Sequence, residues 1–369
     1  MQNHSVNQFR HWVESHLNSS IKTENSVGND TSGSLSRTEC NQGHAVVLDD
    51  FSPLAGDAGH RQYFRATSCD GSWIAVRYPR RSQEEIERFV TLADFFRCRG
   101  VHTAGVVAAD GELGYLLLED LGVVHLLDQL SPETADSLYA DAMMNMLCLQ
   151  QFPAEEITPL KLPHYSRERL RMEMNLMCEW FVGPLLGHTL SAAEQRMLDE
   201  SFAVLENSAA EQPQVLVHRD FHSRNLILRH AETMAVIDFQ DAVIGPVSYD
   251  PVSLLRDCYI EWPEDKVAQW AECYRRLAED AGILVDVDES TFFRWFDLMG
   301  LQRHIKVLGI FSRLSLRDNK HQYLQDLPLV VRYVRQISSQ YSALTAFSDW
   351  FEQKLMPLVH QQEWYADEH

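Results

Sequence analysis

The sequence predicts a two-lobed α+β fold, with a small strand-rich lobe followed by a larger helical lobe. Short apolar runs rich in β-branched and aromatic residues, broken by Gly, Pro and Asp, dominate residues 45–121. Long amphipathic segments dominate residues 122–369, with one strand-like interruption. A chain of 369 residues also exceeds the size that a single hydrophobic core usually serves, which favours two lobes.

Residues 1–44 are expected to form a short helix and a flexible linker in front of the first lobe. Apolar residues recur at helical spacing from Gln8 to Leu17. Asn18 to Gly43 is dominated by Ser, Thr, Asn and Gly, and such a stretch buries too little apolar surface to offset its ordering entropy. We therefore expect this linker to be mobile and dispensable for catalysis. The alternative is a loop that contacts elsewhere in the protein keep ordered.

The first lobe is expected to contain five strands and one helix. The strands are predicted at Ala45–Leu48, Gln62–Thr67, Trp73–Tyr78, Gly105–Ala109 and Tyr115–Glu119. Ser82 can cap a helix that extends to Arg99. Glu85 is expected on the apolar face of this helix, together with Phe89 and Phe96.

The second lobe is expected to be mainly helical. Amphipathic segments are predicted at about residues 132–151, 165–182, 191–209, 247–260, 264–282, 288–312 and 320–360, the last of them broken near its middle. Residues 215–239 interrupt this pattern as strand, polar loop, strand and strand. Asp250 precedes Pro251 and is a candidate N-cap for the helix that follows.

Composition excludes several classes of partner. The chain has 53 acidic and 32 basic residues, and its net charge of −21 disfavours binding to nucleic acid or to anionic lipid. No apolar run approaches the roughly 20 residues that span a bilayer, and the N-terminus lacks the apolar core of a signal peptide. The seven cysteines are scattered and form no Cys-x-x-Cys pair. We expect a cytoplasmic protein; the sequence does not specify its oligomeric state.

The interruption at residues 215–239 carries the most informative motif. An apolar strand leads into His218-x-Asp220-x-x-x-x-Asn225, and a later strand ends at Asp238. Asp220 can accept the proton of an attacking hydroxyl and hold that hydroxyl in line for phosphoryl transfer. Asn225 and Asp238 offer hard oxygen ligands for Mg²⁺ on ATP phosphates, and His218 would brace the loop. The pattern follows the catalytic-loop logic of kinases.

A metal site or a capped surface loop is the alternative interpretation of this segment. His218, Asp220 and His222 could act as metal ligands or as capping residues. Zinc usually requires three or four converging ligands, and the sequence offers no second His/Asp cluster of clear spacing. The ordered strand-loop-strand context favours the kinase interpretation.

Several blocks resemble the aminoglycoside phosphotransferase/choline kinase-like superfamily, in which a His follows the catalytic Asp by two residues, as His222 does here. More closely, they look like the bacterial anomeric kinases of N-acetylmuramate and N-acetylglucosamine. The similar blocks are residues 56–65, 116–122, 218–225, 238–250 and 253–259, within a resemblance that covers roughly residues 45–340. The resemblance implies a protein-kinase-like fold and an ATP- and Mg²⁺-dependent sugar kinase of peptidoglycan recycling. It also implies that Asp250 supports the catalytic loop.

The resemblance implies that backbone groups of the first lobe contact the nucleotide. Gly56 and Gly59 would let backbone N–H groups approach the phosphates, although such glycines often only make a turn. Backbone groups around Glu119 and Leu121 would meet the adenine edge. A central strand with its turn would give the same sequence pattern.

Arg77 occupies the place of the strand Lys that grips the α- and β-phosphates in protein kinases. A guanidinium binds phosphate but differs in shape from an ammonium. Glu85 is its expected ion-pair partner, because its helical face is predicted to turn inward. The alternative is an outward-facing strand arginine.

On the acceptor side the resemblance implicates His222, Glu173 and Trp180. Arg224 or Arg256 could meet the lactyl carboxylate of N-acetylmuramate through charge-assisted hydrogen bonds, which neutral N-acetylglucosamine cannot make. Glu173 and Trp180 could instead be helix-packing residues, and both arginines could be structural salt-bridge partners.

Two other functions compete with an amino-sugar kinase. An aminoglycoside or amino-alcohol O-phosphotransferase would suit the acidic charge of the chain. A nucleotide-binding pseudokinase or adaptor is the non-enzyme alternative. Asp220, Asn225 and Asp238 argue against it, because a scaffold has no need of all three.

Overall fold

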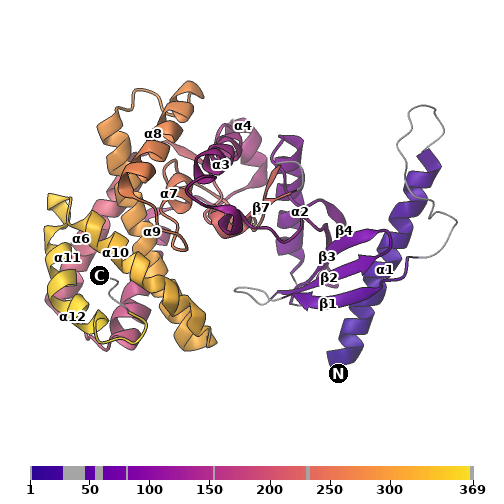
Figure 1. Ribbon diagram of the computed structural model, residues 1–369, viewed down its shortest axis with the longest axis horizontal. Helices are drawn as coiled ribbons and strands as arrows, with labels where there is room; N and C mark the ends of the chain where they lie inside the picture. The colour runs from indigo at the N-terminus through magenta and orange to yellow at the C-terminus, as the bar shows by residue number, and fades with distance from the viewer. Residues whose placement is uncertain are drawn as a thin grey trace. The chain divides into compact units, whose positions relative to one another are not determined.

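The computed structural model describes residues 2–27, 46–54, 61–79, 82–152, 154–229 and 233–365. These residues form two compact units that divide after Gly122 (Figure 1). The first unit is built around a strand-rich sheet and the second is mainly helical, as the sequence predicts. No helix among the described residues combines the length and the apolar character needed to cross a bilayer.

The first unit contains a five-stranded antiparallel sheet with two helices. The strands are β1 (Asp50–Leu54), β2 (Gln62–Ser68), β3 (Gly71–Arg77), β4 (Val106–Asp110) and β5 (Tyr115–Glu119), in the spatial order β1-β2-β3-β5-β4. The helices are α1 (Gln2–Val27) and α2 (Gln83–Cys98). The predicted positions of the helix α2 and of β2, β3, β4 and β5 agree with these bounds to within a few residues.

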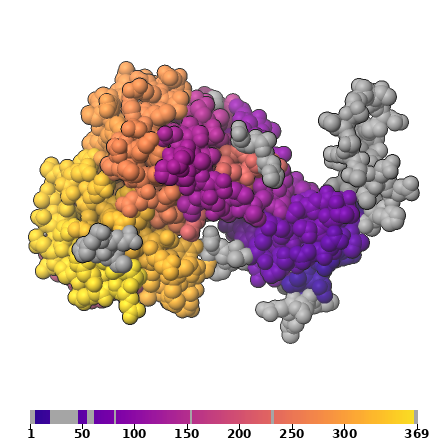
Figure 2. All heavy atoms as spheres, viewed as in Figure 1, coloured from indigo at the N-terminus to yellow at the C-terminus, as the bar shows by residue number. Residues whose placement is uncertain are grey.

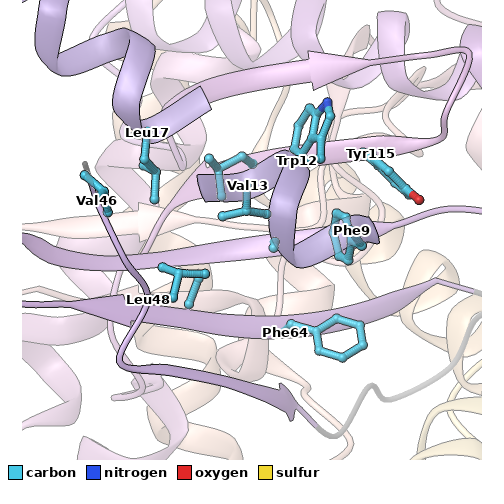
Figure 3. Close-up of a cluster of buried hydrophobic side chains, with 11 residues drawn as sticks. Phe9, Trp12, Val13, Leu17, Val46, Leu48, Phe64 and Tyr115 are labelled. Atoms are coloured by element: carbon cyan, nitrogen blue, oxygen red, sulfur yellow. The ribbon is translucent and has the colours of Figure 1, made fainter. Parts of the chain in front are cut away.

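Helix α1 forms one half of the hydrophobic core of the first unit. Its buried side chains are Phe9, Trp12, Val13 and Leu17, and they pack against Phe64, Ala66, Ala75, Tyr115 and Leu117 of the sheet (Figure 3). The ring centroids of Phe9 and Tyr115 lie 4.5 Å apart. Strand alternation places the sheet residues of this cluster on one face. Helix α1 is therefore part of the lobe, and not a separate segment in front of it.

The structure corrects the predicted linker and the predicted first strand. Asn18–Val27 continues α1, and residues 28–43 lie outside the described residues. The Asn18 amide donates a hydrogen bond to the Val46 carbonyl at 3.2 Å, so this polar residue ties the helix to the chain before β1. Val46 and Leu48 are buried against α1 but form no strand. The Leu48 carbonyl accepts a hydrogen bond from Arg10 instead, at 2.6 Å, and strand pairing starts at Asp50.

The prediction for the inward face of α2 was wrong at Glu85. Glu85 is exposed, and Ile86 takes the buried position in line with Phe89 and Phe96. The difference is one residue of helical rotation, about 100°. Ser82 precedes the helix as predicted, but its hydroxyl donates to the Pro79 carbonyl at 2.8 Å and caps no helix N–H.

The second unit is mainly helical, with two small antiparallel strand pairs. Its longer helices are α3 (Ala135–Gln150), α5 (Arg167–Leu176), α6 (Ala192–Glu211), α7 (Tyr249–Leu255), α8 (Glu264–Asp280), α9 (Glu289–Asp318) and α10 (Leu327–Ser338). Shorter helices are η1 (Leu126–Gln129), α4 (Ala154–Ile157), η2 (Thr158–Leu160), η5 (His321–Asp326), η6 (Ser342–Leu344), α11 (Thr345–Trp350) and α12 (Met356–Val359). The segments η3 (Met177–Leu185) and η7 (Phe351–Leu355) are π-helical.

The strand pairs frame the loop that carries the kinase-like motif. Strand β6 (Gln214–Val217) pairs with β9 (Val243–Pro246), and β7 (Leu226–Leu228) pairs with β8 (Met234–Val236). The one-turn helix η4 (Ser223–Asn225) lies between β6 and β7. Strands β6, β7 and β8 match the predicted strand, loop, strand and strand, whereas β9 was not predicted.

Helix α9 is the central helix of this unit. It contacts α5, α6, α7, α8, α10 and the π-helix η3. Helix α10 packs directly against α9. Figure 2 shows the C-terminal residues, coloured yellow, beside orange residues on one face of this unit. The approach to η3 is closest at Gly309, where an added Cβ would lie 2.3 Å from the Leu176 carbonyl carbon and 2.5 Å from the Met177 nitrogen. Only glycine allows the two backbones to meet there.

We expect Gly309→Ala to destabilise the protein by about 1–3 kcal/mol or more. The added methyl group would overlap the backbone of Leu176 and Met177, which cannot shift without moving the helix that carries it. Gly300→Ala on the same helix is the matched control, since its Cβ would meet only Val252 at 3.4 Å and Arg256 at 3.6 Å. The control gains helix propensity and should be neutral or slightly stabilising. Thermal unfolding of both variants tests this; equal melting temperatures would contradict the close approach.

Candidate active site

The candidate catalytic loop, called the catalytic loop below, runs from the end of β6 to the start of β7. Its backbone is fixed on both sides of Asp220. The Asp220 N–H donates to Nδ1 of His218 at 3.3 Å, and the Asp220 carbonyl accepts from the Asn225 amide at 3.0 Å. His218 Nε2 donates to the Ile237 carbonyl at 3.0 Å. Burial lowers the pKa of His218, so the neutral ring can donate at one nitrogen and accept at the other.

Asp250 holds the same loop from the first turn of α7. Its two carboxylate oxygens accept the backbone N–H groups of His218 at 2.7 Å and of Arg219 at 3.0 Å. Burial raises the pKa of Asp250 to about 7, although these two hydrogen bonds act in the opposite direction. The helix already begins at Tyr249, so Asp250 is not the N-cap that the sequence suggested. Its carboxylate bonds to the catalytic loop instead of to its own helix.

Two residues of the site have left-handed backbone conformations. Arg219 has φ +79° and Asp238 has φ +64°. Such conformations are costly for residues with a Cβ and persist only where surrounding contacts impose them. Asp250 imposes the first through the Arg219 N–H. The second occurs at the turn that follows β8, where Asp238 is exposed.

Asn225 and Asp238 fit the role of Mg²⁺ ligands. The Ile237 N–H donates to the Asn225 carbonyl at 3.0 Å, which joins the segments that carry the two side chains. The Asn225 side-chain N–H bond to Asp220 leaves its amide oxygen without a donor among the described residues. Mg²⁺ in kinases is usually held by one or two protein oxygens together with substrate phosphates. Within the described ranges, no three His, Cys, Asp or Glu residues are grouped as a metal site.

The Asp220 carboxylate is ionised and takes no hydrogen bond from the described residues. Burial by itself would raise its pKa, but neighbouring groups outweigh that effect and hold the pKa at about 2. These groups are Lys306, His222, Arg219 and His218. A half-buried carboxylate that stays charged and has no internal donor can accept the hydroxyl proton of a substrate.

Glu173 positions the catalytic loop and has little capacity left for a sugar. This buried carboxylate accepts from Arg219 at 2.6 Å, lies 3.5 Å from the Lys306 ammonium, and accepts the Tyr165 hydroxyl. Burial raises the pKa of Glu173, but Lys306 and Arg219 lower it further, so it stays ionised. The geometry therefore favours a structural role for Glu173.

Sequence reasoning missed Lys306. This ammonium lies on α9, is 6% exposed, and donates to the Tyr249 hydroxyl at 2.9 Å. A weak signal was present, because Lys306 lies between Ile305 and Val307 in a long helix, and a lysine is almost never buried unless it is paired. The sequence could not show which of the many acidic residues pairs with it.

The structure places Arg256 away from any acceptor role and Trp180 on η3. The Arg256 guanidinium is 3% exposed and donates to Asp297 at 2.7 Å and to Glu264 at 2.6 Å. It is therefore a structural salt-bridge partner. Trp180 is half-buried in the π-helix that packs on α9.

His222 and Arg224 lie against the same aromatic ring. The His222 ring centroid is 5.4 Å from that of Tyr259, and the Arg224 guanidinium carbon lies 3.6 Å from the Tyr259 centroid. Burial lowers the pKa of His222, so the imidazole is neutral. Both residues follow Asp220 directly in the catalytic loop and are half-buried.

In the first unit, the predicted ion pair between Arg77 and Glu85 was wrong. The register pairs Arg77 with Gln62, and alternation places Arg77 on the same sheet face as Ala75, the face that α1 covers. The guanidinium donates to the Gln62 side chain and to the Ser5 hydroxyl of α1, at 2.9 and 2.7 Å. Arg77 therefore joins the sheet to α1.

Of the residues predicted to contact the nucleotide in the first unit, Leu121 keeps free backbone groups in the described structure and Glu119 does not. Gly56 and Gly59 lie outside the described residues. The Glu119 N–H donates to the Gly105 carbonyl at 2.8 Å, so it cannot donate to an adenine edge. Leu121 is buried, and no described residue hydrogen-bonds its backbone, which leaves its N–H and carbonyl as the better candidates.

Comparison with known proteins shows the family of this chain. Residues 50–284 match the phosphotransferase enzyme family. A protein from Pseudomonas putida named N-acetylmuramate/N-acetylglucosamine kinase is 36% identical over 332 residues, which cover 90% of this chain and 91% of that protein. A protein of the same name from Neisseria meningitidis is 38% identical over 299 residues, covering 80% of this chain and 87% of that protein.

Solved structures show the fold that this chain shares. The ADP-bound aminoglycoside phosphotransferase APH(2'')-Ib aligns with a TM-score of 0.55 at 14% identity, over 79% of this chain and 94% of that one. The choline kinase LicA from Streptococcus pneumoniae aligns with a TM-score of 0.54 at 10% identity, over 81% and 94% of the two chains. The fold is the two-lobed, kinase-like fold of these enzymes, and the chain belongs to the phosphotransferase enzyme family.

Proposed function

We propose that this protein transfers the γ-phosphoryl group of Mg²⁺-bound ATP to the anomeric hydroxyl of N-acetylmuramate or N-acetylglucosamine. The product would be a sugar 1-phosphate, and the reaction would serve the recycling of peptidoglycan sugars in the cytoplasm. The names of the relatives at 36% and 38% identity support the acceptor class. The observation that carries the proposal is the Asp220 carboxylate, ionised, without an internal donor, and fixed through its backbone by His218 and Asn225.

We infer that residues of the second unit carry out each step of the reaction. The sugar O1 hydroxyl donates a hydrogen bond to Asp220, which orients it toward the γ-phosphorus. As the O1–P bond forms and the bond to the leaving ADP oxygen breaks, Asp220 takes the hydroxyl proton. Asn225 and Asp238 would hold Mg²⁺, which neutralises charge on the phosphate oxygens. His218 and Asp250 keep the loop in place.

The acceptor atom is tested by comparing each free sugar with its 1-O-methyl glycoside in an assay of ADP release. We expect both free sugars to be phosphorylated and both glycosides to be inert, because the glycosides lack the anomeric hydroxyl. Equal phosphorylation of the free sugars and the glycosides would exclude transfer to C1. Turnover with aminoglycosides or choline alone would assign the protein to that class of acceptor instead.

A further inference from the structure

The two proposed acceptors differ in charge, and this inference rests on the function proposed above. N-acetylmuramate carries a lactyl carboxylate, whereas N-acetylglucosamine is neutral. A protein with a net charge of −21 repels an anionic acceptor at long range. Binding of both sugars at one site therefore requires a cation close to the carboxylate.

Most cations of the second unit that surround the catalytic loop are already paired. Arg219 and Lys306 share Glu173, and Arg256 is bound by Asp297 and Glu264. Arg303 makes no hydrogen bond to a described residue through its side chain, but it is only 3% exposed. None of these four combines free donors with access to solvent.

Arg224 differs from them in both respects. It lies on η4, between Asp220 and Asn225, and is half-buried. Nothing in the described ranges accepts a hydrogen bond from its guanidinium or pairs with it as an ion. Arg224 acts on the carboxyl of Asp326 through its charge and lowers the pKa of that group, but burial outweighs this effect and raises the pKa to about 6. No ion pair joins Arg224 and Asp326 in the part of the chain that the structure describes.

The guanidinium is held by the ring of Tyr259, and we call the two side chains the Arg224–Tyr259 stack. At 3.6 Å from the ring centroid, the guanidinium carbon is in contact with the ring face. The Tyr259 ring also stacks on Phe311, with centroids 6.3 Å apart. A guanidinium that lies on an aromatic ring keeps its N–H donors for a planar anion and loses little entropy on binding one.

The backbone on both sides of the stack is anchored by a single buried carboxylate. Asp257 is 1% exposed and accepts from the N–H of Ser223 at 3.0 Å and from the N–H of Tyr259 at 3.4 Å. His125 contributes a further anchor, because its Nδ1 bonds the Arg224 carbonyl at 2.6 Å. The stack is thus preorganised: Arg224 lies in the loop that carries the proposed base, and Asp257 bonds this loop to the segment that carries Tyr259.

We propose that the Arg224–Tyr259 stack binds a carboxylate on the acceptor sugar and so determines the use of N-acetylmuramate. Arg224 donates charge-assisted, two-pronged hydrogen bonds to the lactyl carboxylate while Asp220 orients the anomeric hydroxyl. N-acetylglucosamine binds the same site without this contact. The stack is a specificity determinant and takes no part in the chemical step.

The test measures kcat and KM of Arg224→Gln for both sugars. Loss of a hydrogen-bonded charge pair corresponds to a decrease of about 10- to 100-fold in kcat/KM for N-acetylmuramate, mainly through KM. The value for N-acetylglucosamine should stay within about threefold of wild type, since no bond to it is lost. Arg224→Lys, which keeps the charge but not the planar fork, should fall between the two. Arg317→Gln, at an exposed arginine paired with Asp318, is the matched control and should change neither sugar.

The methyl ester of N-acetylmuramate separates charge from size. Wild type should use the ester less well than the acid, and Arg224→Gln should make no distinction between them. An equal loss of kcat/KM for both sugars in Arg224→Gln would indicate that Arg224 acts on the phosphoryl group or on the loop, and it would overturn the inference. Unchanged kinetics with both sugars would also overturn it. Wild-type activity on N-acetylglucosamine alone would overturn this inference and leave the proposed function standing, whereas activity on neither sugar would overturn both.

Discussion

Replacing Asp220 with Asn is expected to lower kcat by about 10²- to 10⁴-fold, the range that a positioned general base contributes. The amide has the shape of the carboxylate but cannot accept the hydroxyl proton. KM for the sugar should change much less, because a neutral amide can still hydrogen-bond the hydroxyl. The fold should persist, since the Asp220 carboxylate accepts no hydrogen bond from the described residues and the loop is held through the Asp220 backbone.

Asp250→Asn is the informative comparison for this variant. Asp250 accepts two backbone N–H groups of the loop with its two oxygens, and an amide can accept only through one. We therefore expect Asp250→Asn to lower the melting temperature as well as activity, whereas Asp220→Asn lowers activity alone. Asp280→Asn, at an exposed position near the end of α8, should change neither. An Asp220→Asn enzyme with near-normal turnover would remove Asp220 from the role of base.

The sequence predicted the strand-loop-strand conformation of residues 214–236 well because its signals are local. The spacing of His218, Asp220 and Asn225 between two short strands places them in one loop, and the structure joins them by hydrogen bonds. Asp238 follows the next strand, and one backbone bond from Ile237 to Asn225 connects the two segments. Residue type, spacing and strand ends were sufficient here.

Ion-pair partners could not be predicted in the same way. Glu85 was assigned to Arg77 from its predicted helical face, and Glu173 was assigned to the acceptor side from the family resemblance. Helical periodicity does not decide which residue at the edge of an apolar face turns inward. In the structure Glu85 is exposed, and Glu173 meets Arg219 and Lys306, which come from two other segments. Pairing over such separations depends on how helices cross, and a single sequence does not contain that information.

The error at residues 18–27, which were predicted as linker and are helical, has a related cause. Polar composition indicates that a segment buries little apolar surface. It does not exclude a helix whose other end is anchored in the core. Asn18 directly follows Leu17, a buried residue of α1, and still bonds to Val46 at the edge of the core. Likewise, the apolar alternation of Val46 and Leu48 correctly indicated burial, but their buried side chains contact a helix and not a neighbouring strand.

Removal of residues 1–44 is expected to prevent the first unit from folding stably. The deletion takes away four buried side chains of the core, Phe9, Trp12, Val13 and Leu17, and exposes the sheet face that they cover. Burial of one such side chain is worth about 1.5–3 kcal/mol. Four together approach the stability of a whole domain, about 5–15 kcal/mol. The truncated protein should be insoluble or should lack a cooperative unfolding transition.

Point variants on α1 distinguish a loss of packing from a general effect of shortening the chain. Phe9→Ala should cost about 3–5 kcal/mol, because the Phe9 ring is fully buried and contacts Phe51, Phe64 and Tyr115. Gln8→Ala, at the exposed neighbouring position, should leave the melting temperature unchanged and serves as the matched control. A truncated protein that unfolds cooperatively at the wild-type temperature and phosphorylates its sugar at the wild-type rate would show that α1 is dispensable. Loss of activity with a fully retained melting temperature would instead indicate that residues 1–44 act on the reaction, and packing against the sheet would not explain their effect.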